Sequence, residues 1–193
     1  MAIKNKNIKF VAAYGTAKQL PNSTKPEISF VGRSNVGKSS LLNKLCGQNK
    51  LAKVSSKPGK TTTINFFDAN EFYLVDLPGY GFAARSKSEL SRWSNLIEGY
   101  FEGDRIFALI VLLIDIRHDP TKQDLQMLDY VHALGLPFMV ALTKADKLSK
   151  QQINNTVKKT HKLLNEEIPV VTTSAISGVG ISKLEEHISL ALS

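Results

Sequence analysis

The sequence predicts an α/β fold in which helices cover both faces of a mostly parallel, six-stranded sheet with one antiparallel edge strand. From Glu27 onward, apolar runs typical of strands alternate with segments of helical periodicity. One run, Ile106 to Asp115, is almost uninterrupted, as expected of a central strand covered on both faces. Two short runs, Ile64 to Ala69 and Glu71 to Asp76, are separated only by Asn70, which predicts an antiparallel hairpin.

The chain divides into a short arm and one domain. Residues 1–26 are expected to form an N-terminal arm with an edge strand around Ile8 to Ala13, and residues 27–193 a single domain. Gly47 to Lys60 shows no period and contains a Pro-Gly pair, so it is predicted to be a mobile loop.

The remaining elements follow from hydrophobic spacing. Apolar side chains that recur every three to four residues predict helices, and the expected helices are Ser40–Leu45, Ser86–Phe101, Thr121–Leu134, Ser149–Glu166 and Ile181–Leu192. Short β-branched and apolar runs predict three more strands, at Ile28–Val31, Phe138–Thr143 and Val170–Ser174.

The composition is that of a soluble globular protein. Of the 193 residues, 42% are hydrophobic and 22% are charged. The longest apolar run, Ile106 to Ile114, is too short to span a membrane, and residues 1–9 lack the apolar region of a secretory signal. The single cysteine, Cys46, has no partner for an internal disulfide, and we expect it to be a packing residue. A cytoplasmic protein without membrane attachment is therefore expected.

The net charge of +8 suggests a polyanionic partner such as a nucleic acid, with solubility alone as the simpler alternative. Lysines gather in three groups, one in the arm, one around the predicted mobile loop and one near the C-terminal third of the chain: Lys4, Lys6 and Lys9; Lys44, Lys50, Lys53, Lys57 and Lys60; Lys144, Lys147, Lys150, Lys158, Lys159 and Lys162.

Residues 32–39 carry the pattern Gly-x-x-x-x-Gly-Lys-Ser between a predicted strand and a predicted helix. Glycines at both ends let successive backbone N–H groups turn toward one anion, and the helix N-terminus adds a partial positive charge. The lysine can reach the β- and γ-phosphates of a nucleotide, and the serine hydroxyl can ligate Mg²⁺. The predicted phosphate-binding residues are Gly32, Arg33, Ser34, Asn35, Val36, Gly37, Lys38, Ser39 and Ser40.

Three further stretches at strand ends narrow the choice of nucleotide. The Asp76 carboxylate can hold the water shell of Mg²⁺, and the Gly79 N–H can sense a γ-phosphate. The carboxylate of Asp146 can accept two hydrogen bonds that guanine offers and adenine does not, while the stem of Lys144 lies across the base. Thr143 precedes this pair at the strand end. The next strand end supplies Ser174 and Ala175, and with them the backbone N–H that is expected to meet the guanine O6.

The segment Pro58 to Thr63 lies between the phosphate loop and the hairpin. Gly59 and Lys60 lead into three consecutive threonines, and any of Thr61, Thr62 or Thr63 can close over the nucleotide and add its hydroxyl to Mg²⁺. These motifs alone leave two alternatives to a GTP-driven switch: a small-molecule kinase or ATPase, and a regulatory GTPase with a protein partner.

The chain resembles the EngB (YihA/YsxC) ribosome-assembly GTPases, which belong to the translation-factor-like class. The stretches that carry the resemblance lie between about Ser29 and Leu192 and are Gly32–Ser40, Lys57–Thr61, Ile64–Phe67, Asp76–Ala83 and Asp115–His118. The resemblance implies a three-layer, Ras-like P-loop GTPase fold and a GTP-binding (G) domain. It also implies a bacterial cytosolic enzyme that hydrolyses GTP to GDP and phosphate. Its partner would be the large (50S) ribosomal subunit and its rRNA, and the protein itself a monomer.

By motif match, the resemblance gives individual residues their roles. Thr61 would ligate Mg²⁺ beside Ser39, with Asp76 acting through water, and the catalytic residues would be Lys38, Thr61, Gly79 and Asn35. Asn35 matches the position at which related GTPases hold a K⁺ ion, so stimulation by K⁺ is a hypothesis.

Four residues near these motifs depart from the general GTPase pattern or have more than one possible role. Ras-like enzymes have a water-orienting glutamine where this chain has Tyr80, which predicts slow intrinsic hydrolysis. Many GTPases have asparagine where this chain has Thr143. Arg117 and His118 either contact RNA, couple to the switch segments or begin a solvated loop; the sequence leaves these open.

Overall fold

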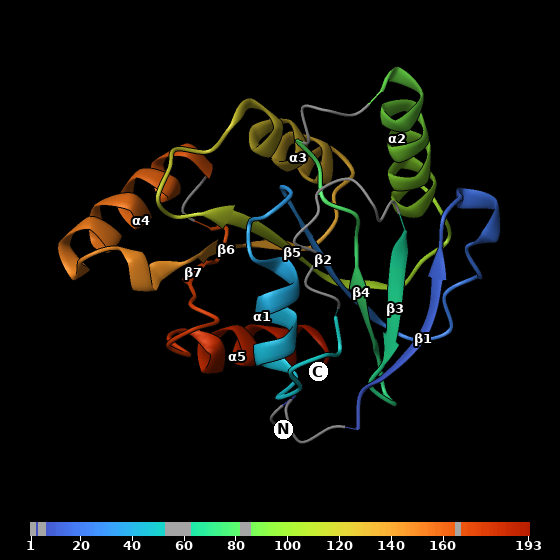
Figure 1. Ribbon diagram of the computed structural model, residues 1–193, viewed down its shortest axis with the longest axis horizontal. Helices are drawn as coiled ribbons and strands as arrows, with labels where there is room; N and C mark the ends of the chain where they lie inside the picture. The colour runs from blue at the N-terminus through green and yellow to red at the C-terminus, as the bar shows by residue number, and fades with distance from the viewer. Residues whose placement is uncertain (1–2, 4–6, 53–62, 82–85, 165–166) are drawn as a thin grey trace.

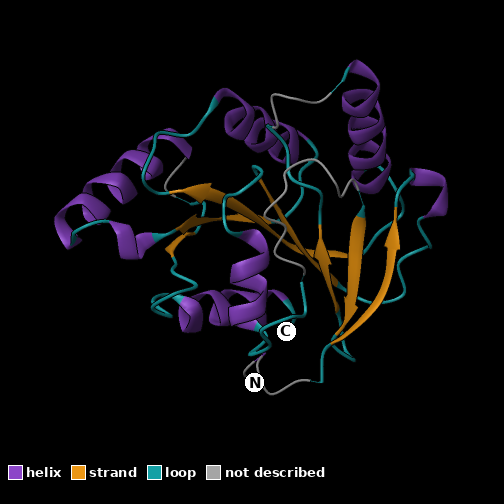
Figure 2. Ribbon diagram, in the orientation of Figure 1, coloured by secondary structure: helices purple, strands orange, loops and turns teal. Residues whose placement is uncertain are grey.

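The computed structural model describes residues 3, 7–52, 63–81, 86–164 and 167–193. In this part of the chain a seven-stranded sheet lies between two layers of helices (Figures 1 and 2). The strands lie side by side in the order β1-β3-β4-β2-β5-β6-β7. Their bounds are β1 Lys9–Tyr14, β2 Glu27–Gly32, β3 Ile64–Asp68, β4 Tyr73–Asp76, β5 Phe107–Asp115, β6 Phe138–Thr143 and β7 Val170–Thr172.

The predicted fold class is confirmed, but the predicted number of strands is not. β3 runs antiparallel to both of its neighbours, while the other neighbouring pairs are parallel. The seventh strand, β1, pairs with β3 along its outer side. The antiparallel strand β3 therefore does not lie at the edge of the sheet. Aromatic contacts hold β1 there, because the ring centroids of Phe10 and Phe67 are 5.8 Å apart and those of Tyr14 and Phe66 are 5.6 Å apart.

Two helices cover one face of the sheet and three cover the other. α1 (Lys38–Leu45) and α5 (Ile181–Ala191) share one hydrophobic core. α2 (Lys87–Phe101), α3 (Lys122–Ala133) and α4 (Lys150–Leu164) contribute to the second core on the opposite face. Successive residues of β5 alternate between these cores, which confirms the prediction of a central strand buried on both sides. Within the described residues, none of the helices combines the length and apolarity that a bilayer crossing requires.

A buried ion pair joins β2 to the segment between α2 and β5, at the end of the sheet where β2 and β5 begin. The guanidinium of Arg105 donates to both carboxylate oxygens of Glu27, at 2.9 and 2.6 Å. The Tyr100 hydroxyl donates to the same carboxylate at 2.6 Å, and the Glu27 side chain has no solvent exposure. This clamp satisfies a fully buried charge and fixes the end of β2 opposite the phosphate loop.

The parallel strands end together on the other side. Gly32 at the end of β2 pairs with Leu113 of β5, and Asp115 at the end of β5 pairs with Thr143 of β6. Loops that follow parallel strands at such an edge form the usual ligand crevice of an α/β sheet. The motifs singled out in the sequence leave the sheet at this edge.

Candidate active site

The phosphate loop runs from the end of β2 into α1. Its last glycine, Gly37, has a φ of 103°, a left-handed conformation that a side chain would strain. The first helical hydrogen bond of α1 is donated by Leu41 to the Gly37 carbonyl, at 2.9 Å. The backbone N–H groups of Lys38, Ser39 and Ser40 come before that bond, so they lack an acceptor within the helix. The loop therefore offers donors at a helix N-terminus, which suits a phosphate.

Lys38 and Asp76 form an ion pair at the start of α1. The ammonium of Lys38 donates to one oxygen of the Asp76 carboxylate, which lies at the end of β4 and is almost buried. The Asn65 amide lies 3.4 Å from the other oxygen. The structure thus brings together the lysine predicted for the phosphates and the carboxylate predicted for the Mg²⁺ waters. Together with the Ser39 hydroxyl, the carboxylate is an oxygen donor of the kind that Mg²⁺ prefers, so these residues fit that ion.

The segment after Asp76 lies against the phosphate loop. A Cβ on Gly79 would lie 3.0 Å from the Ser34 backbone nitrogen, which is tighter than an ordinary contact, so this close approach favours glycine. The Ser34 N–H donates to the Tyr80 carbonyl at 2.8 Å. These contacts continue the pairing of β2 and β4 beyond the strands.

Tyr80 is a buried structural residue. Its ring is 4% exposed, and its hydroxyl donates to the Asp124 carboxylate of α3 at 2.7 Å. Burial, and then the neighbouring Asp124 charge, raise the pKa of Tyr80 far above its ordinary value. On α2, the indole of Trp93 contacts the Tyr80 ring edge-on and donates to the Pro78 carbonyl at 3.1 Å. The sequence showed Tyr80 directly after the Asp-x-x-Gly motif but did not predict that Asp124 would accept its hydrogen bond.

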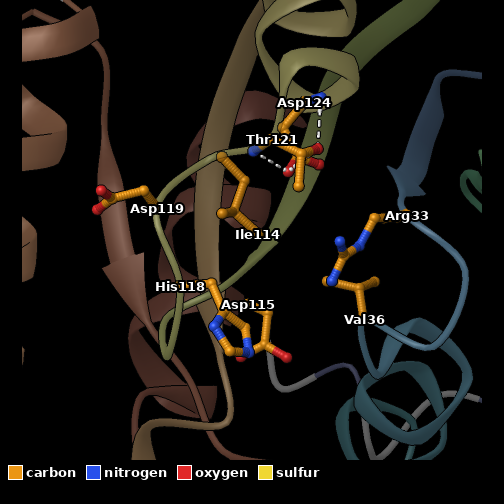
Figure 3. A pocket seen from close by; sticks show the side chains of 8 residues that line it. All are labelled: Arg33, Val36, Ile114, Asp115, His118, Asp119, Thr121 and Asp124. Carbon is orange, nitrogen blue, oxygen red and sulfur yellow. Dashed lines mark hydrogen bonds between the residues drawn. The ribbon is translucent and has the colours of Figure 1, made fainter. Parts of the chain in front are cut away.

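Asp124 has a second role at the start of α3. Its other carboxylate oxygen accepts hydrogen bonds from the Thr121 backbone N–H at 2.8 Å and from the Thr121 hydroxyl at 2.7 Å (Figure 3). A threonine followed three residues later by an acidic residue is a capping box, and this pattern was visible in the sequence. One buried carboxylate therefore joins the segment after Asp76 to the N-terminus of α3.

The predicted guanine-binding residues lie together at the ends of β6 and β7. The Ser174 hydroxyl donates to the Asp146 carboxylate at 2.6 Å, and Lys147 lies 3.3 Å from the same carboxylate. The hydrogen bond from Ser174, more than the other contacts, lowers the pKa of Asp146 below its ordinary value. Ala175 follows in the turn after Ser174. An ionised carboxylate held in this position can accept the two guanine hydrogen bonds.

Asp115 connects this region to the phosphate loop. Its carboxylate accepts Lys144 at 2.8 Å and the guanidinium of Arg117 at 2.7 and 2.9 Å. The Lys144 ammonium also donates to the Asn35 carbonyl at 2.9 Å. Burial opposes ionisation of Asp115, but the hydrogen bonds from Arg117 and Lys144 outweigh it and hold the pKa well below the usual range. Sequence reasoning did not assign this role to Asp115, although an acidic residue at the end of an apolar strand, two positions before Arg117, was a signal.

Thr143 makes a contact to the phosphate loop through its hydroxyl. The hydroxyl lies 2.7 Å from the Val36 carbonyl and 3.3 Å from the Ile114 carbonyl, and the residue is buried. Threonine therefore ties β6 to the phosphate loop at the position where many GTPases have asparagine.

A small hollow, open to solvent, lies between the phosphate loop and α3 (Figure 3). Arg33 and Val36 line it from the phosphate loop, and Asp115 and His118 line it from the end of β5. Of the two residues left open by the sequence, Arg117 is thus paired with Asp115, while His118 borders this hollow.

Gly59, Lys60 and Thr61 lie among residues 53–62, outside the described residues. The other predicted site residues are described and gather at one edge of the sheet: residues 32–40 in the phosphate loop and α1, Asp76 and Gly79 after β4, Thr143, Lys144 and Asp146 after β6, and Ser174 and Ala175 after β7.

Comparisons with known proteins point to one family. Residues 27–144 match the family model described as "50S ribosome-binding GTPase", and residues 98–193 match the "Elongation factor Tu GTP binding domain". The chain is 43% identical over 187 residues to the "Probable GTP-binding protein EngB" of Cytophaga hutchinsonii, covering 94% of each chain. It is 48% identical over 166 residues to the protein of the same name from Gemmatimonas aurantiaca, covering 85% of this chain and 81% of that one.

Solved structures agree with this result. A crystal structure of a probable GTP-binding protein EngB matches with a TM-score of 0.72 at 26% identity, over 86% of this chain and 98% of that chain. Era, solved in complex with MgGDPNP and nucleotides 1506–1542 of 16S ribosomal RNA, matches with a TM-score of 0.67 at 26% identity, over 85% of this chain and 56% of that chain.

Proposed function

This chain belongs to the EngB family of GTPases, and from that premise we propose that it is a GTP-driven switch in the assembly of the large ribosomal subunit. The single observation that carries the nucleotide part of the proposal is the convergence of the phosphate loop, the Lys38–Asp76 pair and the Asp146–Ser174 pair on one edge of the sheet. The ribosomal part is supported by the name of the matching family model and by the net charge of +8.

The chain's own residues would bind GTP at both ends. The N–H groups at the start of α1 and the Lys38 ammonium would hold the phosphates, and Asp146 would select guanine. Lys144 would lie across the base, fixed there by Asp115 and by the Asn35 carbonyl. Lys38 and Asp76 would have to separate, because Lys38 is then needed by the phosphates.

Mg²⁺ bound through Ser39 and Thr61, with Asp76 acting through water, would neutralise charge on the β- and γ-phosphates. Asn35 is exposed on the phosphate loop, which suits the proposed K⁺ contact. Tyr80 lacks the carboxamide with which a glutamine at this position orients the attacking water, and its hydroxyl already donates to Asp124. We therefore expect slow intrinsic hydrolysis, as a switch requires. If Asn35 helps to hold K⁺, the GTPase rate should be higher in KCl than in NaCl. Equal rates in the two salts would remove K⁺ from the proposal.

Co-sedimentation with purified large ribosomal subunits tests the partner. A non-hydrolysable GTP analogue and GDP are compared across a salt series. Pelleting that is stronger with the analogue and falls with salt is the expected result. Equal pelleting in both states would refute the switch, and absence of pelleting at low salt would refute the ribosomal partner.

Asp146→Asn separates GTP recognition from the alternatives. In a guanine site, the change removes the acceptor for two donors of the base and shifts preference from GTP toward XTP. A small-molecule kinase or ATPase would show no such shift in competition binding with fluorescent GDP. A regulatory GTPase with a protein partner would show the shift, but its complex would survive ribonuclease treatment.

A further inference from the structure

Helix α4 has two chemically distinct faces. Its inner face packs on the second core through Ile153, Val157 and Leu164, with Thr160 buried beside them. Its outer face is exposed and consists almost wholly of lysines and amides: Lys150, Gln151, Gln152, Asn154, Asn155, Lys158, Lys159, Lys162 and the lone apolar residue Leu163. Figure 1 shows this helix at one end of the molecule, beside β6 and β7.

The charge on α4 is of one sign. The helix carries four lysines and no acidic residue, which equals half of the chain's net charge of +8. By contrast, α2, α3 and α5 each carry both lysine or arginine and acidic side chains. Surfaces that serve solubility usually mix the signs, and lysines four residues apart, such as Lys158 and Lys162, repel each other and destabilise the helix. The pattern therefore favours a binding role over solubility.

We propose that the outer face of α4 binds the phosphate backbone of RNA. The proposal rests on the proposed function, since it names the surface by which the chain would meet rRNA. Lys150, Asn154, Lys158 and Lys162 recur every fourth residue, so they form one stripe about 18 Å long at 1.5 Å per residue. Lysines suit phosphates, and side-chain amides suit phosphate and ribose hydroxyl oxygens. A membrane surface fits poorly, because Leu163 is the outer face's one apolar side chain.

The α4 face adjoins the guanine-binding residues. α4 begins at Lys150, and two residues separate it from the short 3₁₀ helix Ala145–Lys147 that contains Asp146. Lys159 also pairs with Asp119 at 2.6 Å, and Asp119 lies in the loop that follows Asp115, the last residue of β5. RNA bound on this face would therefore lie beside the elements that hold the base.

The test compares two triple variants with the wild-type protein. Lys150→Gln/Lys158→Gln/Lys162→Gln removes three charges from the stripe and leaves the Lys159–Asp119 pair intact. The matched control, Lys9→Gln/Lys18→Gln/Lys183→Gln, removes three exposed lysines from β1, from the 3₁₀ helix Ala17–Gln19 and from α5. All six side chains are exposed, so GDP affinity should equal wild type in both variants. Thermal unfolding should equal wild type in the control and equal or slightly exceed it in the α4 variant, because the repulsion between Lys158 and Lys162 is removed.

Two probes are titrated across a KCl series: a short fluorescein-labelled RNA duplex, by anisotropy, and purified large subunits, by pelleting. The α4 variant should lower the slope of log K against log salt for the duplex by about 2–3, because each of the three lost phosphate contacts contributes about 0.7–0.9. It should also weaken pelleting, whereas the control variant keeps both.

Each other outcome has one meaning. Duplex binding of the α4 variant equal to that of the control overturns the proposal, and loss of pelleting alone would then assign the face to a ribosomal protein. If the wild-type protein fails to pellet with subunits, the ribosomal function falls, while the duplex titration still decides the α4 face.

Discussion

Replacing Tyr80 by phenylalanine removes one hydroxyl from a buried hydrogen bond and changes little else. The hydroxyl donates to Asp124 at 2.7 Å, and both residues are 4% exposed. In the variant, one oxygen of the Asp124 carboxylate loses this donor, and the link between the segment after β4 and the N-terminus of α3 is broken.

A hydrogen bond to a charged group contributes about 1.5–3 kcal/mol, so the free energy of unfolding should fall by about 2 kcal/mol. At about 2.1 cal/mol/K per residue, the entropy of unfolding of a 193-residue chain is about 0.4 kcal/mol/K. The midpoint of thermal unfolding should therefore fall by about 5 °C.

Tyr130→Phe is a matched control, because it removes a tyrosine hydroxyl from α3, the helix that carries Asp124. Among the described residues, the Tyr130 hydroxyl is buried without a hydrogen-bond partner, and burial raises its pKa. Removing it should leave stability unchanged or slightly increased. Calorimetry or urea unfolding monitored by circular dichroism measures both variants. Equal stability of Tyr80→Phe and Tyr130→Phe would refute the structural role given to Tyr80.

Three further predictions concern other buried polar contacts. Asp115→Asn should weaken GDP binding by about tenfold, the equivalent of 1.4 kcal/mol. The pKa of Asp115 is lower in the folded protein than in the unfolded chain, so ionised Asp115 contributes its full stabilisation above the unfolded pKa of about 3.9. The difference in stability between wild type and variant should therefore shrink as the pH falls below about 3.9. A difference that does not change with pH in urea unfolding would contradict this. Thr143→Val leaves the Val36 carbonyl without its donor and should cost about 1–2 kcal/mol of stability, while Thr143→Ser should retain most of it; equal losses would count against the hydroxyl. Arg105→Met strands the buried Glu27 charge and should cost about 3–5 kcal/mol, and the double variant with Glu27→Leu should recover most of that loss; no recovery would show that the charge is not the cause.

Local signals predicted most of the secondary structure. The strand Phe138–Thr143 has the predicted bounds, α2 and α5 differ from prediction by one residue at one end, and α3 differs by one residue at each end. α2 and α3 also begin with capping boxes at Ser86 and Thr121, so local propensity and packing agree there. The edge strand expected around Ile8 to Ala13 is confirmed as β1, but the count of six strands was wrong because this strand joins the main sheet. Phe10 and Tyr14 hold β1 against β3, more than fifty residues later in the chain, and such a pairing leaves little trace in a single sequence.

The same limit applies to the site. The motif residues were placed at the sheet edge because strand ends meet there, and this follows from the alternation of strands and helices alone. The partners that fix those residues were not predicted: Asp115 for Lys144, and Asp124 for Tyr80. Each contact joins separate elements, so it depends on the register of the whole sheet rather than on a motif.

The Lys38–Asp76 pair has a consequence for how fast nucleotides exchange. The carboxylate acts as an internal competitor for the ammonium that the phosphates require. A nucleotide that dissociates leaves both charges with a ready counter-ion, which lowers the free energy of the nucleotide-free form relative to the bound one. We therefore expect rapid spontaneous exchange and modest affinity, so the nucleotide state of the protein would follow the cellular ratio of GTP to GDP without an exchange factor.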